Sequence, residues 1–293
     1  MFIFLFAFGI YACMELVKSR RLLAGTASEL AETKKKLSVL EYKIRNITDS
    51  LVYARHIQKV LLPSESFLEN HFRDYFIFYQ PRDIVSGDFY WFGKVGGKIC
   101  IVSADGTGHG VPGALISIIG QNLLNQAIND GNADNPTEII ERLDKLVRTF
   151  FLREGENYIR DSMDIGICMV DYVNKTIEFA GAFSSMYFIK DNKLKELKGD
   201  IQILGMKSDG FRFSCKVENF SGGEAIYLFT DGYADQFGGE ENKKFMFRRF
   251  RYLLTTINML PLKEQKKILE ETLNSWKGNN EQVDDILVIG LRL

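Results

Sequence analysis

The first part of the chain carries a helical repeat of apolar positions that stops at Pro63. With Leu23 at position a of a heptad, nine of the twelve a and d positions are apolar, and no proline interrupts the run. The a positions are Leu23, Leu30, Leu37, Ile44, Leu51 and Gln58, and the d positions are Thr26, Thr33, Leu40, Ile47, Ala54 and Leu61. The pattern predicts one long signalling helix within residues 18–62. Its seam over residues 22–62 either pairs with a second copy, as a parallel coiled-coil homodimer, or packs on its own domain.

The N-terminus is apolar and uncharged. The run FIFLFAFGIYACM precedes Glu15, and the basic residues Lys18, Arg20 and Arg21 follow. The stretch is slightly short for a span of about 20 residues, and no basic segment precedes it as in a signal peptide. We expect residues 1–17 to be a transmembrane segment, single-pass or the end of a multi-pass region. Basic residues after it would place the rest on the cytoplasmic side of the inner membrane. A buried core helix is the alternative.

After Pro63 the apolar pattern shortens to strands. The expected strands are DYFIFYQP, DFYWFG, KICIVSAD, SMDIGICMVD, KTIEFAGA, SMYFIK, FRFSCKVENF, EAIYLFTD and DILVIGLRL. Helices are expected in two pairs, over residues 112–130 and 135–151, and over residues 243–257 and 261–276. Runs of strands with helix pairs between them predict an α+β domain over residues 63–293, with antiparallel sheets covered by helices.

Charge and cysteine usage exclude two classes of function. Residues 15–62 hold ten Lys or Arg against five Asp or Glu, whereas residues 63–293 hold 27 against 33. The globular part therefore lacks the basic excess of a nucleic-acid-binding domain, and no nucleic-acid partner is expected. The four cysteines form no CxxC pair, and the three histidines are scattered, so a zinc site is not expected either.

Four aspartates stand at the edges of short apolar runs, each next to a glycine or a second acidic residue. They are Asp88 in VSGDFYW, Asp105 in IVSADGTGHGVPGA, Asp231 in YLFTDGYADQF and Asp284 in QVDDILVIG. Gathered by a folded sheet, these carboxylates would repel one another unless a cation neutralised them, and oxygen ligands suit Mg²⁺ or Mn²⁺. Singly, Asp105 and Asp231 also fit ordinary Asp-Gly turns. Together, the four predict a metal site in which the ions keep bound waters.

These segments resemble the motifs of the metal-dependent serine/threonine phosphatases, the PPM or protein phosphatase 2C-like family. VSGDFYW, ADGTGHGVPGA, TDGYADQFGG and DDILVIG occur in the family's order. The lead-in SLVYARHIQKVLLPSE is similar to that of the bacterial SpoIIE/RsbU-type branch. The resemblance covers roughly residues 48–293. It implies a four-layer α-β-β-α sandwich. Together with the elements predicted above, the expected fold is this sandwich preceded by a long coiled-coil helix and a short N-terminal hydrophobic segment.

The resemblance also implies a reaction, the hydrolysis of phosphoserine or phosphothreonine by a water activated between two ions of Mn²⁺ or Mg²⁺. Carried over by motif, Asp88 bridges the ions, Asp105 and the Gly106 carbonyl bind one, Asp231 and Asp284 bind the other, and Asp235 matches a position for a third ion or a bound water. Asp285 stands where many relatives have asparagine. Because neighbours on a strand face opposite sides, we expect Asp284 rather than Asp285 to face the site.

Three further residues are candidates, and two of them, Arg82 and His109, keep two interpretations each. Asp164, in DSMDIGIC, lies near a family position that is often acidic or small. Arg82 is either a phosphate contact, through its forked guanidinium, or a surface arginine. His109 is either a proton donor to the leaving serine or a hydrogen-bonded loop histidine. The loop GTGHGVPG lacks the features of a Walker or dinucleotide-binding loop, which disfavours a nucleotide-handling enzyme.

The predicted function is therefore a protein serine/threonine phosphatase controlled by an N-terminal sensor stalk. The implied substrate is a phosphorylated regulatory protein, of the STAS-type anti-anti-sigma factors that antagonise anti-sigma factors in partner switching. The alternative is a phosphatase-like adaptor that binds a phosphoprotein without turning it over. Intact aspartates at all four positions argue against the adaptor.

Overall fold

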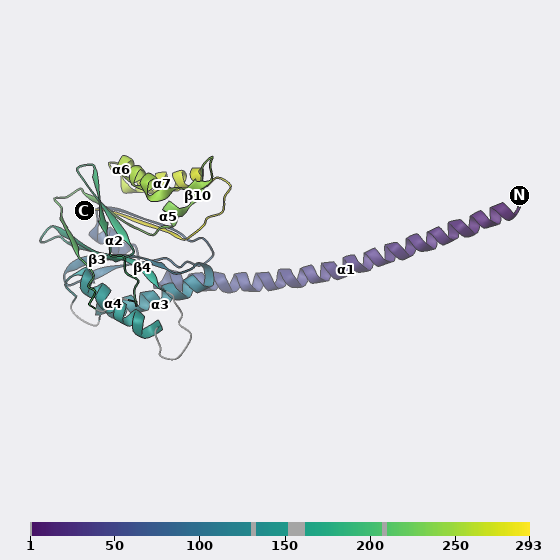
Figure 1. The fold of residues 1–293 in the computed structure, drawn as a ribbon, viewed down its shortest axis with the longest axis horizontal. Coiled ribbons are helices and arrows are strands. Elements are labelled where there is room, and N and C mark those ends of the chain that lie inside the picture. Colours follow the sequence, from purple (N-terminus) through teal and green to yellow (C-terminus); the bar gives the residue numbers. More distant parts are fainter. Residues whose placement is uncertain (1, 130–132, 152–161, 207–209) are drawn as a thin grey trace. The chain divides into compact units, whose positions relative to one another are not determined.

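The computed structural model describes residues 2–129, 133–151, 162–206 and 210–293, and divides into two compact units, residues 1–53 and 54–293. The described residues of the first unit all lie within helix α1 (Phe2–Leu61), which confirms the predicted long helix (Figure 1). The final turns of α1, from Ala54, belong to the second unit. Seam side chains such as Leu37, Leu40 and Ile47 are 53 to 62% exposed in this single chain. Pairing with a second copy stays a prediction.

The expectation of a membrane-spanning segment, and with it an inner-membrane location, is wrong. Within the part of the chain that the structure describes, no helix combines the length and the apolar character needed to cross a bilayer. The physical reason lies in the sequence of α1, because charged residues follow the apolar run from Glu15 onward, so the described helix contains no apolar stretch of about 20 residues.

Two five-stranded antiparallel sheets form the centre of the second unit. The first contains, in spatial order, β1 (Asp74–Gln80), β12 (Ile286–Arg292), β9 (Ala225–Phe229), β6 (Ser185–Lys190) and β7 (Lys193–Lys198). The second contains β2 (Phe89–Val95), β3 (Lys98–Gly106), β4 (Met163–Asp171), β5 (Thr176–Ala182) and β8 (Lys216–Asn219). The apolar alternation of the sequence thus predicted most of these strands correctly.

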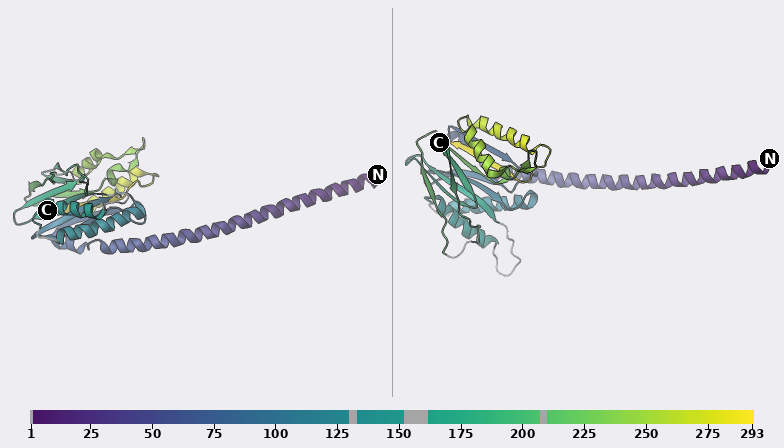
Figure 2. Two further views of the ribbon diagram at one scale, coloured as in Figure 1. Left: turned by 60° about the horizontal axis from the view of Figure 1, so that its bottom comes forward. Right: turned by 45° about the horizontal axis from the view of Figure 1, so that its top comes forward.

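Helix pairs cover the outer faces of both sheets, which confirms the α+β class and the four-layer sandwich (Figures 1 and 2). Helices α3 (Gly110–Asn129) and α4 (Pro136–Phe151) pack on the second sheet, and α6 (Met246–Ile257) and α7 (Leu262–Lys277) on the first. Three apolar cores separate the four layers. Leu124 lies in the core under α3 and α4, Ile289 between the sheets, and Phe250 under α6 and α7.

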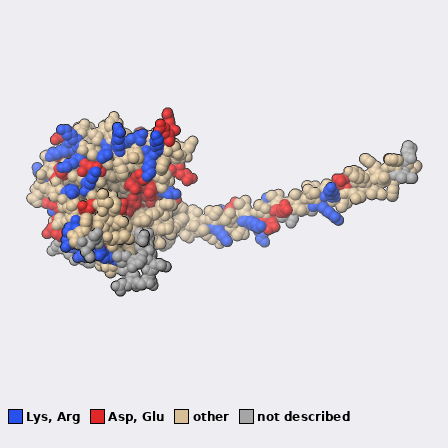
Figure 3. All heavy atoms as spheres, in the orientation of Figure 1, with Lys and Arg blue, Asp and Glu red and all other residues tan. Residues whose placement is uncertain are grey.

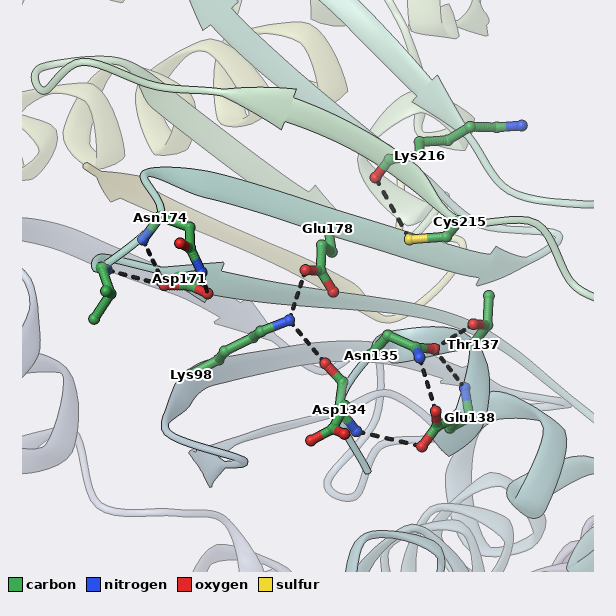
Figure 4. A network of polar contacts seen from close by, with 11 residues as sticks. Lys98, Asp134, Asn135, Thr137, Glu138, Asp171, Asn174, Glu178, Cys215 and Lys216 are labelled. Atoms are coloured by element: carbon green, nitrogen blue, oxygen red, sulfur yellow. Dashed lines mark hydrogen bonds and ion pairs between the residues drawn. The ribbon is translucent and has the colours of Figure 1, made fainter. Parts of the chain in front are cut away.

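The start of α4 shows how local sequence chemistry places a helix. Asn135 precedes Pro136, and its Oδ1 accepts hydrogen bonds from the Glu138 backbone N–H, at 3.1 Å, and from the Thr137 hydroxyl. Lys98, at the start of β3, donates to the Asp134 carbonyl, at 2.8 Å, and to Glu178 of β5, at 2.6 Å. Figure 4 shows this network joining the sheet to the helix. It ties the start of α4 to β3, the strand that carries Asp105.

The short and polar elements were not predicted. Strand β7 has the sequence KLKELK and lies at a sheet edge, where its residues are alternately exposed. Because most of its residues are charged, the apolar pattern did not predict it. The other missed elements are α2 (Ser66–His71), α5 (Gly232–Asp235) and the hairpin of β10 (Phe237–Gly238) and β11 (Lys243–Lys244). Conversely, only Lys216–Asn219 of the expected strand FRFSCKVENF is a strand.

Candidate active site

Asp88 lies at the start of β2, and three groups of the protein hold it. The Thr230 hydroxyl donates to Asp88 Oδ2 at 2.6 Å, and the Tyr79 hydroxyl donates to the Asp88 carbonyl oxygen at 3.0 Å. The Asp88 backbone N–H donates to Ser86 Oγ at 3.1 Å. The side chain is 1% exposed, so burial raises its pKa well above the usual value, the Thr230 hydrogen bond lowers it, and Asp285 adds to the rise.

Asp105, Asp231 and Asp284 lie at neighbouring strand ends and act on Asp88 and on one another. Asp105 is near the end of β3, Asp231 follows β9 at the start of α5, and Asp284 precedes β12. Burial raises the pKa of Asp105 well above its usual value, and the charges of Asp88, Asp231 and Asp284 add to the rise. Asp231 is exposed at its surface. Even so, desolvation by the surrounding protein, followed by the charges of Asp235 and Asp284, raises its pKa to about 6. We call these four residues the carboxylate cluster.

Two glycine-bearing loops approach each other beneath the carboxylate cluster. A Cβ atom at Gly87 would lie 2.5 Å from the Gly108 carbonyl oxygen and 2.7 Å from that of Gly106. The Gly106 N–H donates to the Gly87 carbonyl at 3.2 Å. Any side chain at Gly87 would push the loops apart, and with them Asp88 and the Gly106 carbonyl.

Asp284 and Asp285 have different surroundings. Both carboxylate oxygens of Asp285 accept backbone hydrogen bonds, Oδ1 from Arg82 and Oδ2 from Gly87, each at 2.7 Å. Asp285 is 2% exposed, and it fixes the loop that leads to Asp88. Asp284 is half-buried, and its Oδ1 accepts the Asp285 N–H at 2.9 Å. The geometry is consistent with Asp284 as the ligand and gives Asp285 a positioning role that sequence reasoning missed.

The other candidates from the sequence, Asp235, His109 and Arg82, each contact another group of the protein. The Lys244 ammonium pairs with Asp235 Oδ2 at 2.6 Å, so a cation of the protein already neutralises part of that position. His109 Nδ1 lies 2.9 Å from Asp83 Oδ2 on an exposed loop, as the loop-histidine interpretation expects. Arg82 is exposed, and its Nη1 donates to the Val283 carbonyl at 3.0 Å.

Asp164 lies directly opposite Asp105 in the register of β4 and β3. Burial and then the Asp231 charge raise its pKa to about 6. Thus Asp164 belongs to the same acidic region, although its motif match was weak. Figure 3 shows acidic side chains gathered on one face of the globular unit, with basic side chains around them.

Gln58 is a second residue that sequence reasoning missed. Although it lies on α1, it is 9% exposed, and its Nε2 donates to the Ser86 carbonyl, at 2.7 Å, and to Ser117 Oγ of α3, at 2.8 Å. Its Oε1 accepts the Ser86 N–H at 3.1 Å. The sequence signal for this role is that Gln58 is a polar residue at position a of the heptad seam, where apolar residues predominate.

The donor chemistry of the carboxylate cluster fits a hard divalent cation. The donors are carboxylate and carbonyl oxygens. The pKa values of Asp88, Asp105 and Asp231 are raised first by burial and then by neighbouring carboxylates, and a bound cation would offset both effects. As the side chains stand, no group of three or more His, Cys, Asp or Glu residues, among those the structure describes, is arranged to hold a metal ion.

Comparison with known proteins identifies the family of the chain. Residues 95–293, more than half of the chain, match the family model described as stage II sporulation protein E (SpoIIE). The phosphoserine phosphatase RsbU of Bacillus subtilis (strain 168) is 26% identical over 160 residues, which is 53% of this chain and 44% of RsbU. The chain therefore spans less than half the length of that curated relative.

Solved structures give the same result for the fold. The SiaA-PP2C domain of Pseudomonas aeruginosa is 33% identical, with a TM-score of 0.77, over 85% of this chain and 98% of that domain. The PP2C phosphatase domain with a regulatory fragment of SpoIIE from Bacillus subtilis is 16% identical, with a TM-score of 0.59, over 75% of this chain and 60% of that one. The protein thus belongs to the SpoIIE family of PP2C-type serine/threonine phosphatases.

Proposed function

We propose that this protein hydrolyses phosphoserine and phosphothreonine on a partner protein with the help of Mn²⁺ or Mg²⁺. The observation that carries the proposal is the convergence of the carboxylate cluster from four separate strand ends. Repelling carboxylates in one place destabilise a fold unless they serve a ligand. Two bound cations would supply a water of lowered pKa and positive charge toward the phosphoryl oxygens.

We assign the role of holding the ions to the carboxylate cluster and the Gly106 carbonyl. Asp88 lies among Asp105, Asp231 and Asp284, so it is the candidate bridge, and the Thr230 hydroxyl keeps its carboxylate in place. Asp105 with the Gly106 carbonyl would hold one ion, and Asp231 with Asp284 would hold the other. Asp235 is the weaker candidate, because Lys244 competes for its carboxylate.

For the substrate, we propose a phosphorylated regulatory protein, and a STAS-type anti-anti-sigma factor is the first to test. Similarity to RsbU, a phosphoserine phosphatase, supports this choice. One structural neighbour, 18% identical with a TM-score of 0.51, is described as "The bacterial stressosome: a modular system that has been adapted to control secondary messenger signaling". The substrate would approach from the solvent side of Asp231, the open edge of the cluster.

For the stalk, we propose that the seam of α1 pairs two copies in parallel. The first unit has no other element against which Leu37, Leu40 and Ile47 can be buried, and these side chains are mostly exposed in the single chain. Burying such a row against an identical row is the ordinary way to stabilise a long amphipathic helix.

The experiment that tests the proposed function uses the full chain. Phosphate release from a phosphoserine peptide and from an aryl phosphate is measured in MnCl₂, in MgCl₂ and in EDTA. We expect turnover that saturates with the metal ion and stops in EDTA. Tight binding of the phosphopeptide without turnover under any metal condition would favour the adaptor instead.

A further inference from the structure

A side pocket of about 230 Å³ opens beside the carboxylate cluster. It shares Asp105 and Asp231 with the cluster and extends between the rings of Phe183, Phe229 and Phe247. The remaining lining includes Ser103, Asp164 and Glu196. None of the described residues that line it is a lysine, an arginine or a histidine. The pocket thus combines aromatic walls with carboxylates.

A buried hydroxyl group in this pocket has no partner. Ser103 is 2% exposed, and its Oγ makes no hydrogen bond to any group in the described residues. Gly166, opposite Ser103 on β4, keeps the space open, because a Cβ there would lie 3.5 Å from Ser103 Oγ and 2.9 Å from Ser184 Oγ. Buried hydroxyls nearly always have a partner, so the unpaired Ser103 points to a polar group supplied from outside.

The ring at the mouth of the pocket is held in an unusual backbone conformation. Phe183 has a φ of +51°, which a bulky residue rarely adopts, and its side chain is 47% exposed. The Phe183 N–H donates to the Asp200 carbonyl at 2.9 Å, and the Gly199 N–H donates to the Ser184 carbonyl at 3.0 Å. Strain of this kind persists where the surrounding structure imposes it, often at ligand contacts. Here it presents an apolar ring to solvent beside the cluster.

The charges of the residues that line the pocket determine which charge its ligand carries. Asp164 lies outside the assigned ion ligands, so its carboxylate stays available in the pocket when ions are bound to the cluster. Glu196 also lines the pocket, but the Arg251 guanidinium at 3.0 Å and the Lys198 ammonium at 3.9 Å offset its charge. An anionic side chain would be repelled, whereas an aliphatic stem with a cationic end would contact the phenyl rings and the carboxylates together.

We propose that the side pocket binds a lysine or arginine side chain of the phosphoprotein, at a position flanking the phosphorylated residue. The Ser103 hydroxyl accepts a hydrogen bond from the cationic end, and the rings of Phe183 and Phe247 contact the stem. This inference rests on the proposed function, and it adds a sequence preference to it. The protein would act on phosphoserine sites with a basic neighbour.

The test compares phosphoserine peptides that differ at one flanking position, with lysine, its uncharged analogue norleucine, or glutamate. The full chain is assayed in MnCl₂ as wild type and as Phe247→Ala and Ser103→Ala. At one position we expect kcat/KM to favour lysine over norleucine by about tenfold, with glutamate below both. Both variants should reduce this preference several-fold while turnover of a small aryl phosphate stays at the wild-type level.

A purely structural role of Ser103 would give a different result. Removal of an unpaired buried hydroxyl should leave the melting temperature unchanged or raise it, so lost peptide preference in a stable Ser103→Ala protein indicates ligand contact. Equal kcat/KM for the three peptides at every position, or a lysine preference that both variants retain, would overturn the pocket assignment.

Absence of all turnover would refute the proposed function alone. Fluorescence anisotropy of the same labelled peptides would then decide the pocket, and equal affinities would overturn it.

Discussion

Gln58 and Ser86 form a pair of hydrogen bonds, from Gln58 Nε2 to the Ser86 carbonyl at 2.7 Å and from the Ser86 N–H to Gln58 Oε1 at 3.1 Å. Ser86 lies two residues before Asp88, and Gln58 also bonds Ser117 of α3. The end of α1 therefore holds both the loop that carries Asp88 and the helix that follows the glycine-rich loop. We expect this contact to couple the end of α1 to the position of Asp88.

Gln58→Ala should lower the free energy of unfolding by about 1–3 kcal/mol, because the Ser86 amide group and the Ser117 hydroxyl lose a buried partner. It should also raise the Mn²⁺ concentration needed for half-maximal activity, because the Asp88 loop is less well held. Denaturant unfolding and a Mn²⁺ titration of phosphate release measure the two effects. Lys59→Ala, an exposed neighbour, is the matched control. Wild-type values for Gln58→Ala in both assays would show that the contact is not coupled to the site.

The variants Asp284→Asn and Asp285→Asn should show that Asp284 is a metal ligand and that Asp285 positions the loop before Asp88. Asp285→Asn replaces one acceptor of the Arg82 and Gly87 amides, so we expect a stability loss of about 1–3 kcal/mol with substantial residual activity. Asp284→Asn should keep the stability and lose most of the activity, since a neutral amide binds hard cations weakly. Thermal unfolding and saturating-Mn²⁺ kinetics distinguish them. The opposite pattern would exchange the two roles.

Asp231→Asn should stabilise the metal-free protein at neutral pH. The folded-state pKa of Asp231 is raised to about 6 from 3.8, so its ionised form disfavours the fold. This destabilisation is complete above about pH 6 and is relieved as the pH falls through 6 toward 4. In EDTA, the melting temperature of Asp231→Asn should exceed that of wild type at pH 7.5, and the difference should shrink by pH 5.

Added Mn²⁺ should reverse that order at pH 7.5, because only wild type offers the full set of carboxylates. Asp49→Asn, on an exposed position of α1, is the control for the substitution itself. Equal melting temperatures of Asp231→Asn and wild type in EDTA at every pH would show that Asp231 carries no electrostatic penalty.

Leu40→Asp combined with Ile47→Asp should convert a dimer into a monomer. Each change places a charge on an exposed apolar seam position, and two such charges facing their copies oppose pairing. Sedimentation velocity of the full chain at tens of micromolar measures the mass. The control is Tyr42→Asp with Lys43→Asp, off the seam. A monomeric wild-type chain would contradict the proposed pairing.

Periodic and local features of the chain were predictable from the sequence. Apolar alternation predicts most strands, and Asp-Gly pairs at strand ends mark Asp105 and Asp231 as candidate ligands. Asn135 before Pro136 marked a helix start that the structure confirms. These features depend on neighbouring residues alone.

Long-range features were not predictable in the same way. Gln58 counts as a polar interruption in a heptad, and its partners Ser86 and Ser117 lie 28 and 59 residues away. Asp285 likewise bonds amides about 200 residues distant in the sequence. The N-terminal run shows the opposite error, because its apolar composition suggested a span that α1 is not apolar enough to provide.

The most direct test of the central claim is a Mn²⁺ titration of phosphate release from a phosphoserine peptide, for full-chain wild type and Asp105→Asn. The account predicts saturable Mn²⁺-dependent turnover in wild type and a fall of at least about 100-fold in Asp105→Asn, with an unchanged circular dichroism spectrum. Turnover in EDTA equal to that in Mn²⁺, or an Asp105→Asn protein as active as wild type, would contradict it.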